Sequence, residues 1–285
     1  MLAKKGLLLR LSIRQWMARV LDKAVTEQVA IHNQSATDAG RYHKSLLPSG
    51  EALRNIHQKT TLIRKLFYAN TLPWTLEGIH LLPSKNYMDF MTMFKREKAE
   101  WLQLCDTFFN EYASMTASAR ISLGKMYNKD DYPPLDVVQG RFDIDMEVSN
   151  VPQDDFRVEG ISDEEMKNIC KDVETRVTNA SAAAMKEAWE RLYGRVHHMH
   201  EKLSDPKAVF RDTLVENTRE ICEVLKRLNF NDDPNLENLR QEVEISLANH
   251  HPDALRNDPD LRRDKSEEAK AIMAKMKAFM GSNNG

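Results

Sequence analysis

The sequence predicts a mainly α-helical protein: an elongated helical bundle with long coiled-coil-like antiparallel helices and a small two-stranded β element. Two long stretches, residues 84–124 and 162–204, place apolar side chains three or four positions apart, which is the period of one helix face. Two short stretches, residues 7–13 and 142–148, alternate in polarity instead, as strands do. An apolar stripe of this length needs a covering helix, so we expect the long helices to pack against others.

The length is compatible with one elongated helical domain or with two compact ones, and we predict one domain that can be divided into three parts. These are a single elongated helical domain over 1–285, divided into a basic part at 1–130, an acidic strand-containing connector at 131–161, and a long helix with helical hairpins at 162–280. Residues 1–70 hold twelve Lys or Arg against four Asp or Glu, whereas residues 131–165 hold two against eleven. The simpler interpretation of this asymmetry is that the basic start docks on the acidic middle.

The chain should begin with the strand at residues 7–13 and pass directly into a helix. From Ile13 onward apolar residues recur at helical spacing, which predicts a helix to about Asn33. A second helix should end ahead of Pro73. Residues 71–83 are rich in prolines and apolar side chains, which predicts an irregular connection.

The first long helix should be capped by Ser84 and end near Gly124, with Glu97 as the one polar residue in its apolar stripe. Residues 142–148 then give the cleanest alternation in the chain, with an acidic outer face. Because an isolated strand is not stable, we expect this one to pair with residues 7–13.

The second long helix should begin with a capping box, in which Ser162 is the N-cap and Glu165 stands three residues later. Further helix starts are predicted where an acid precedes a proline, because the acid caps the helix and proline suits its first turn. These pairs are Asp205-Pro206, Asp233-Pro234 and Asp258-Pro259.

Composition excludes several classes of protein. No stretch approaches the roughly 20 apolar residues that cross a bilayer, and the three cysteines lie far apart in the sequence without a pairing pattern. We therefore expect a cytoplasmic protein. Gly-rich phosphate loops, Gly-x-Ser-x-Gly elbows and His-Glu-x-x-His helices are missing from the sequence, so no catalytic or cofactor-binding residue is predicted.

One cluster of acidic residues and one cluster of histidines suggest a metal site at first sight. Asp143, Asp145 and Glu147 share a strand face, but successive ligands on a strand stand ~7 Å apart, too far to chelate one ion unaided. His197, His198 and His200 are one to three positions apart, whereas helix ligand pairs stand four apart. A solvated acidic face and a helix C-terminus favourable to histidine are the preferred interpretations, and no metal ligand is predicted.

Candidate partner-binding residues are Trp189, Tyr193 and Asn217. Trp189 and Tyr193 stand one helical turn apart and off the apolar stripe, which predicts an exposed or partner-facing pair. Asn217 occupies a core position, where an amide fixes register or accepts a partner helix.

The basic start of the chain offers an alternative set of binding residues. Candidate phosphate contacts in this region are Arg14, Arg41, Arg54, Arg64 and Lys65. Their dispersal along the sequence is less typical of nucleic-acid binding than a clustered patch would be.

Several segments, spread over nearly the whole chain, resemble one family. They are Trp16 to Asp22-Lys23, Gly40-Arg41-Tyr42, Thr71-Leu72-Pro73-Trp74, Leu82-Pro83 with Tyr87, Asp131-Tyr132-Pro133, Trp189-Glu190-Arg191-Leu192-Tyr193, His198-Met199 and Phe210-Arg211-Asp212-Thr213-Leu214-Val215-Glu216-Asn217. In them the chain resembles uncharacterised phage and prophage proteins that carry only a domain-of-unknown-function label. The resemblance implies no activity. It does imply genes near MoxR-type AAA+ ATPases and von Willebrand A-domain proteins, and hence a role as adaptor or substrate in an ATPase assembly.

These observations predict a non-enzymatic phage helical scaffold or adaptor in the cytoplasm of an infected bacterial host cell. It would act through protein–protein contacts, with a MoxR-type AAA+ ATPase or a second copy as partner, and without a cofactor. The alternative is an accessory protein of phage DNA metabolism that binds nucleic acid through its basic N-terminal region. A metal-dependent enzyme ranks last.

Overall fold

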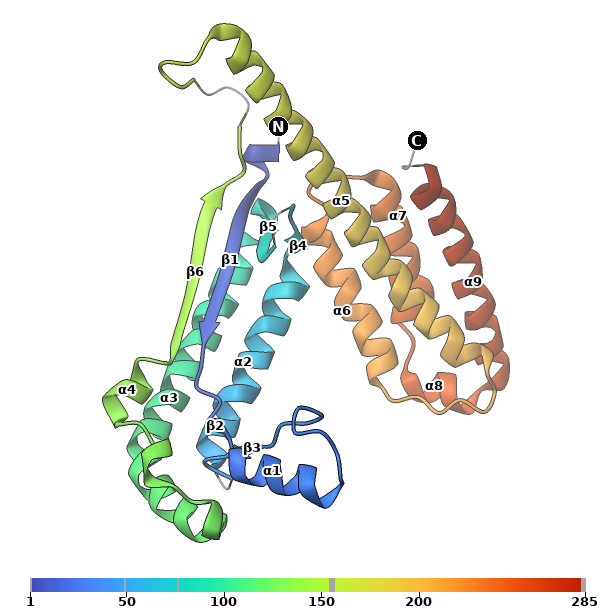
Figure 1. Cartoon of the computed structure of the whole chain (residues 1–285). Helices are drawn as coiled ribbons and strands as arrows, with labels where there is room; N and C mark the ends of the chain where they lie inside the picture. Colours follow the sequence, from blue (N-terminus) through green and yellow to red (C-terminus); the bar gives the residue numbers. More distant parts are fainter. Residues whose placement is uncertain (1, 49, 76, 154–156, 283–285) are drawn as a thin grey trace. The chain divides into compact units, whose positions relative to one another are not determined.

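A computed structural model describes residues 2–48, 50–75, 77–153 and 157–282. It is 67% helical, with nine α-helices in the described part of the chain, which confirms the mainly α prediction (Figure 1). The chain forms two compact units. The first unit comprises Met1–Arg10, Phe67–Met91 and Glu147–Gly285, and the second comprises Leu11–Leu66 and Thr92–Met146.

The main sheet contains β1 (Gly6–Arg14), β4 (Leu72–Pro73), β5 (Ile79–Pro83) and β6 (Asp143–Asn150). Its strand order is β4-β5-β1-β6, so the predicted pairing of the first and last alternating segments is confirmed. The predicted two-stranded element is nevertheless wrong, because β5 pairs antiparallel with the other edge of β1, from Gly6–Pro83 to Arg10–Ile79.

Strands β4 and β5 fall where an irregular connection was expected. Pro83 is the last residue of β5, and Pro73 lies in the two-residue edge strand β4. Proline has no N–H to donate to a neighbouring strand, and this loss destabilises a sheet least at an edge or at the end of a strand. A separate two-stranded sheet joins β2 (Arg19–Leu21) to β3 (His43–Ser45).

The second unit contains α1 (Lys23–His32), α4 (Leu135–Gln139) and most of α2 (Glu51–Asn70) and α3 (Tyr87–Leu123). The predicted helix from Ile13 begins ten residues late, because Ala18 has a φ of 48° and the chain forms β2 first. Asp22 then starts α1 by accepting a hydrogen bond from the Val25 N–H at 3.1 Å.

The core of the second unit is built on the aromatic stripe of α3. Trp101, Phe108 and Tyr112 are buried, and Trp16 packs on the latter two with ring centroids 6.4 and 6.0 Å away. Glu97, the polar residue in that stripe, pairs with Lys59 of α2 at 2.5 Å. A charge in the core register therefore joins the two helices.

The helices of the first unit are α5 (Asp163–Ser204), α6 (Thr213–Leu228), α7 (Pro234–Val243), α8 (Pro252–Asn257) and α9 (Pro259–Ser282). Ser162, Asp233 and Asp258 accept hydrogen bonds from first-turn N–H groups, as predicted. The start predicted at Pro206 is wrong: Asp205 accepts from the Lys207 N–H in a turn, and α6 begins only at Thr213.

Long helix α5 forms the centre of the first unit. Helix α9 runs antiparallel beside it, and α6 packs on it as well (Figure 1). The buried cluster joins Ala184 and Ala188 of α5 to Ile272 and Met276 of α9. Small side chains on α5 let α9 approach closely. Short turns complete the described elements: 3₁₀ turns at Leu2–Lys4, Ser84–Asn86, Gly124–Met126 and Lys129–Asp131, and a π turn at Glu244–Ala248.

Candidate functional site

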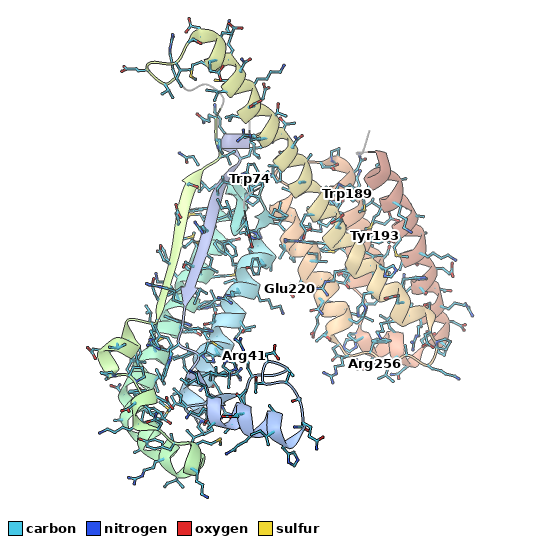
Figure 2. All side chains as sticks on the ribbon, viewed as in Figure 1. Arg41, Trp74, Trp189, Tyr193, Glu220 and Arg256 are labelled. Atoms are coloured by element: carbon cyan, nitrogen blue, oxygen red, sulfur yellow. The ribbon has the colours of Figure 1, made fainter. Side chains whose placement is uncertain are left out.

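Trp189 and Tyr193 lie on α5 within the first unit (Figure 2). The expected exposure of Trp189 is wrong, because only 2% of this residue is accessible. Phe279 of α9 stacks on its indole at a centroid distance of 6.0 Å and an angle of 27°. Tyr193 is half-buried, with the Lys277 ammonium 5.8 Å from its ring centroid. That these two residues bind a partner stays a prediction, and the site would have to lie between α5 and α9 instead of on an exposed helix face.

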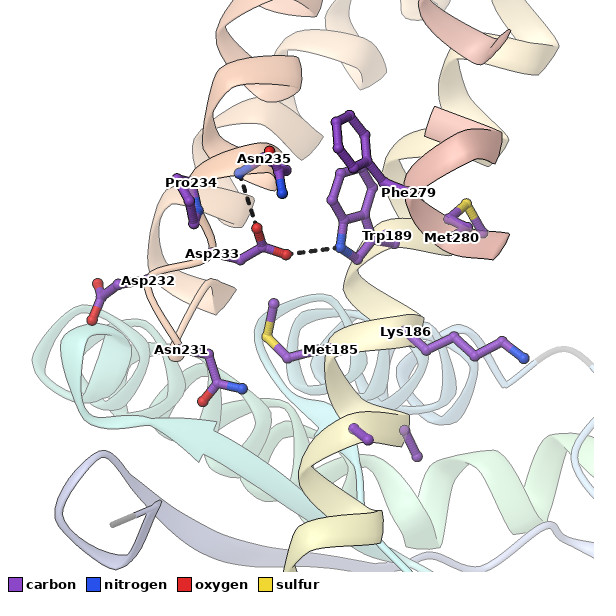
Figure 3. A pocket seen from close by; sticks show the side chains of 12 residues that line it. Met185, Lys186, Trp189, Asn231, Asp232, Asp233, Pro234, Asn235, Phe279 and Met280 are labelled. Atoms are coloured by element: carbon purple, nitrogen blue, oxygen red, sulfur yellow. Dashed lines mark hydrogen bonds between the residues drawn. The ribbon is translucent and has the colours of Figure 1, made fainter. Parts of the chain in front are cut away.

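Trp189 lies in the wall of a cavity of about 710 Å³, which we call the Trp189 pocket (Figure 3). Helix α5 and the end of α9 supply its apolar wall, and the loop before α7 supplies a polar wall. The lining residues are Ala182, Ala183, Met185, Lys186, Trp189, Asn231, Asp232, Asp233, Pro234, Asn235, Phe279 and Met280. A space of this size can enclose the larger part of one drug-sized molecule, or a side chain of a partner protein.

Asp233 holds the two walls together. One carboxylate oxygen accepts a hydrogen bond from the Asn235 N–H at 2.9 Å, and the other accepts from Trp189 Nε1 at 3.1 Å (Figure 3). The first oxygen also accepts from the Leu236 N–H at 3.3 Å. Asn229 and Asp233 also exchange two hydrogen bonds, at 2.8 and 2.9 Å. The rotamer of Trp189 is therefore fixed before any ligand arrives.

Asp232 lies in the loop at the pocket rim and has partners of its own. Its φ is 57°, a conformation that Asp tolerates better than most residues. Its carboxylate pairs with Lys85 and, at 3.1 Å, with Lys5, and mainly the Lys85 hydrogen bond lowers the pKa of Asp232. The carboxylate of Asp232 is therefore already paired with lysines of the same chain.

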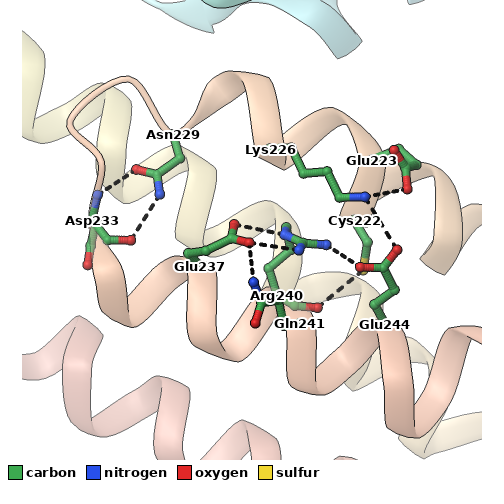
Figure 4. A network of polar contacts seen from close by, with 9 residues as sticks. All are labelled: Cys222, Glu223, Lys226, Asn229, Asp233, Glu237, Arg240, Gln241 and Glu244. Atoms are coloured by element: carbon green, nitrogen blue, oxygen red, sulfur yellow. Dashed lines mark hydrogen bonds and ion pairs between the residues drawn. The ribbon is translucent and has the colours of Figure 1, made fainter.

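A polar network supports α7 behind the pocket (Figure 4). Arg240 is 3% exposed and donates two hydrogen bonds to Glu237, at 2.8 and 2.9 Å, and a third to Glu244. The Arg240 hydrogen bonds lower the pKa of both carboxyl groups. Lys226 of α6 reaches Glu244 at 3.4 Å, so the network ties α6 to α7.

A second hollow lies in the second unit and contains two of the predicted phosphate contacts. Arg14 and Arg64 line it with Arg141, next to Trp16 and Met17, and we call it the arginine groove. No acidic side chain is in its lining. Arg14 pairs with Asp143 at 2.9 Å, whereas Arg64 and Arg141 have no ion pair among the described residues.

The other predicted phosphate contacts lie outside this groove. Arg54 and Lys65 are exposed on α2, and Arg41 lines a separate, mostly uncharged hollow of about 320 Å³ beside Val29 and Tyr42. The structure therefore brings together two of the five basic residues and adds Arg141, which sequence reasoning missed because it follows some 80 residues later.

The predicted histidine and acidic clusters do not form a metal site in the described residues. In the described ranges no three His, Cys, Asp or Glu side chains converge closely enough to hold a metal ion. His200 is instead hydrogen-bonded to Ser266 Oγ at 3.1 Å. Burial raises the pKa of the Cys105 and Cys222 thiols to about 12, so both stay protonated near neutral pH.

Sequence reasoning identified Trp189 but not the residues around it. Asp233 was predicted only as a helix cap, and Phe279 was not among the predicted binding residues. Their contact with Trp189 depends on chain reversals between α5, α7 and α9, for which the local sequence contains no signal.

No family model, curated protein or solved structure matches the chain. Within the described ranges, none of the helices combines the length and the apolar character needed to pass through a bilayer.

Proposed function

We propose that this chain is a non-enzymatic helical scaffold or adaptor that captures a partner protein in the Trp189 pocket. The observation that carries the proposal is a cavity of about 710 Å³ whose aromatic wall is already fixed by hydrogen bonding and stacking. Preorganised pockets of this kind bind with a small entropy cost, because their side chains are ordered in advance.

The chemistry of the walls indicates the occupant. Met185, Phe279 and Met280 offer an adaptable apolar surface. Opposite them, Asn231 and Asn235 offer side-chain amides to a neighbouring backbone. An apolar side chain presented on a partner polypeptide fits both walls, and interface anchors are commonly of this type. The partner we propose is a MoxR-type AAA+ ATPase, with a second copy of this chain as the competing outcome.

Site-specific crosslinking tests the proposal. We would replace Lys186, exposed at the pocket, with a photocrosslinking amino acid and irradiate infected cells that produce the protein. We expect a covalent adduct with the ATPase. Ala183→Trp should abolish the adduct, because the indole fills the pocket from an exposed position without leaving a cavity in the core.

The matched control is Ala271→Trp, which adds the same side chain to an exposed position of α9 outside the pocket lining. This variant should crosslink like the parent. An adduct that survives Ala183→Trp, or no adduct at all, would refute the pocket as the docking site, and an adduct between two copies would replace the ATPase with self-association.

A second function is favoured by the arginine groove. Two cations without ion pairs in the described chain, Arg64 and Arg141, lie beside Trp16 and Met17 without a lining acid. Such a groove suits a phosphate backbone, and Met17, which is exposed, offers an apolar contact to a base. The alternative is therefore an accessory protein of phage DNA metabolism that binds nucleic acid here.

Salt dependence distinguishes this alternative. The double variant Arg64→Gln/Arg141→Gln should weaken binding of a labelled oligonucleotide and lower the salt slope by about 1–2. Arg54→Gln/Lys65→Gln removes two exposed charges of α2 outside the groove and serves as the control. Equal losses in both variants, or binding that ignores salt, would exclude the groove as a nucleic-acid site.

Three further parts of the proposal rest on the sequence. They are membership of the phage and prophage family, a cytoplasmic location in the infected host, and coiled-coil-like packing of the long antiparallel helices. The family resemblance supports the first two, and the apolar stripes of α3 and α5 support the third.

A further inference from the structure

A small cavity of about 190 Å³ opens in the first unit where the last turns of α5 meet the first turns of α6. We call it the basic cavity. Helix α5 contributes Arg195, His198 and Lys202, and the remaining lining comes from the 205–212 loop and α6. Those other residues are Val209, Phe210, Arg211, Thr213, Leu214, Asn217 and Thr218.

The charges of this cavity are unbalanced. Arg195, Lys202 and Arg211 line it, and none of the three has an ion pair or side-chain hydrogen bond in the described part of the chain. Its lining contains no acidic residue. The fourth titratable residue of the lining, His198, does have a partner: its Nδ1 lies 3.9 Å from a carboxylate oxygen of Glu201. Three uncompensated cations around one small space repel one another, so this arrangement does not stabilise the empty protein.

The two acids of the loop beside the cavity, Asp205 and Asp212, have partners outside the cavity lining. Asp212 is in the loop between the cavity and α6, but its carboxylate pairs with Arg256. Arg256 also donates to the Phe210 carbonyl at 3.3 Å. The Asp205 carboxylate accepts from the Lys207 N–H at 2.9 Å. The cations of the cavity are therefore left without a counter-charge from their own loop.

The loop itself is held firmly. Arg262 of α9 donates to the carbonyls of Lys202 (2.7 Å), Leu203 (3.2 Å) and Ala208 (2.9 Å). Its guanidinium carbon also lies 5.3 Å from the ring centroid of Phe210. These contacts hold the backbone of the loop that carries Arg211.

The start of α6 adds a favourable field. Asp212 stands at the N-cap but makes no side-chain cap hydrogen bond, because its carboxylate pairs with Arg256. Thr213 and Asn217 of the first turns line the cavity, and the Asn217 amide has no hydrogen-bond partner within the described ranges. The positive end of the helix dipole and an available amide therefore add to the three cations.

We propose that the basic cavity binds a phosphate group, either as free inorganic phosphate or as the terminal phosphate of a small molecule. Arg195 and Lys202 stand two helical turns apart on one face of α5, about 10 Å along the axis, and long side chains span that gap around one dianion. The volume is below the roughly 300 Å³ of ordinary small-molecule pockets, so the cavity encloses the anionic group and leaves the rest of a ligand outside. This site shares no residue with the Trp189 pocket and goes beyond the adaptor function.

The test is a calorimetric titration of the full chain with inorganic phosphate and, separately, with glycerol phosphate, at constant ionic strength set with chloride. We expect saturable binding at one site. Arg195→Gln, Lys202→Gln and Arg211→Gln should each weaken it by roughly three- to tenfold, as expected for loss of one charge-assisted contact at a partly exposed site.

Matched controls exist on the same helix. Arg176→Gln and Lys171→Gln each remove one exposed charge in the first half of α5, more than a dozen residues from the cavity, and should leave the affinity unchanged. Asn217→Asp keeps the size of the side chain but places a carboxylate among the cations, so it should abolish binding while circular dichroism shows the parent helix content.

The two probes separate the two sources of phosphate. Tighter binding of inorganic phosphate assigns the site to the free ion, and tighter binding of glycerol phosphate assigns it to a small phosphomonoester. Failure of both probes to bind, an equal loss in Arg176→Gln, or unchanged affinity in Asn217→Asp would each overturn the proposal. Binding of an oligonucleotide but neither probe would overturn it in favour of a nucleic-acid site.

Discussion

Lys44 is a cation inside the core of the second unit. It is 7% exposed, its ammonium lies 2.8 Å from Asp131 Oδ2 and 3.5 Å from Asp22 Oδ2, and it donates to the Met126 carbonyl at 2.7 Å. Burial by itself lowers the pKa of this lysine, but the two carboxylates outweigh burial and leave the pKa raised. The side chain therefore stays charged at neutral pH and joins β3 to two distant segments.

Lys44→Met should destabilise the second unit by about 3 kcal/mol, because removing one partner of a buried ion pair leaves the other charge uncompensated. Chemical denaturation followed by circular dichroism measures the change. Lys23→Met, one residue after the Asp22 cap and exposed, is the control and should shift stability by less than about 0.5 kcal/mol. An unchanged or higher stability of Lys44→Met would show that the buried charges are not mutually required.

Single residues were predictable from sequence when their role was local. Ser162, Asp233 and Asp258 were identified as caps because the acceptor and the first-turn N–H groups lie within three residues of each other. The exposure of Trp189 was mispredicted because it is buried by contacts with elements that follow much later in the chain, among them Phe279 of α9. Arg211 was not predicted as a binding residue because its cavity forms only when the end of α5 and the start of α6 fold against each other.

At the level of elements, α7 and α9 both begin with an aspartate cap followed by proline, but the two aspartates differ in one contact. Asp233 and Asp258 both accept two first-turn hydrogen bonds, and Asp233 alone also accepts the Trp189 indole N–H. Asp258→Ala should cost about 1 kcal/mol, the usual value of a cap. Asp233→Ala should cost roughly 1–2 kcal/mol more, since it leaves a buried donor unsatisfied.

Thermal and denaturant unfolding of both variants measures this difference. Asp258→Ala is the matched control, since it removes a cap of the same type from a helix of the same unit. Equal costs would mean that the Trp189 hydrogen bond contributes nothing to stability, and the fixed wall of the Trp189 pocket would then lose its main support.

Whole elements were predictable where a period repeats over many residues, as in α3 and α5. The mistakes lie in short or interrupted segments. Helix α6 begins at Thr213 and not at Pro206, because the Arg262 hydrogen bonds hold the 205–212 loop against α5. Strand β5 was missed because its run of apolar residues ends in proline and shows no alternation.

For the molecule as a whole, the segregation of charge along the chain has a structural counterpart. The basic start supplies β1 and the acidic middle supplies its neighbour β6, with Arg14 paired to Asp143 at 2.9 Å. The two units are each assembled from segments far apart in the sequence. The Trp189 pocket of the first unit and the arginine groove of the second are lined by such distant segments, whereas the basic cavity is lined by residues 195–218 alone. The amino-acid composition did not predict the geometry of any of the three.

Acid should weaken both units. In the second unit, hydrogen bonds from Lys59 and then Arg96 lower the pKa of Glu97, and in the first unit Arg240 lowers the pKa of Glu237 and Glu244. A carboxyl group whose folded pKa lies below its unfolded value stabilises the fold above that unfolded value, near 4.5, and the contribution is lost as the pH falls through the folded pKa.

Because of His80, the stability of the first unit should begin to fall at a higher pH than that of the second unit. Burial, and then the charge of Arg191, lowers the pKa of His80 below 6.5, so the unfolded chain takes up this proton first and stability falls as the pH drops from 6.5. Denaturant unfolding at pH 7.5, 5.5, 4.5 and 3.5, with hydrogen exchange to separate the units, measures both effects. His80→Gln should remove the loss between pH 7.5 and 5.5 while keeping the loss below 4.5, and His32→Gln, an exposed histidine of α1, should follow the parent curve. A parent protein equally stable at pH 7.5 and 3.5, or a His80→Gln profile identical to the parent, would contradict this account of the buried charges.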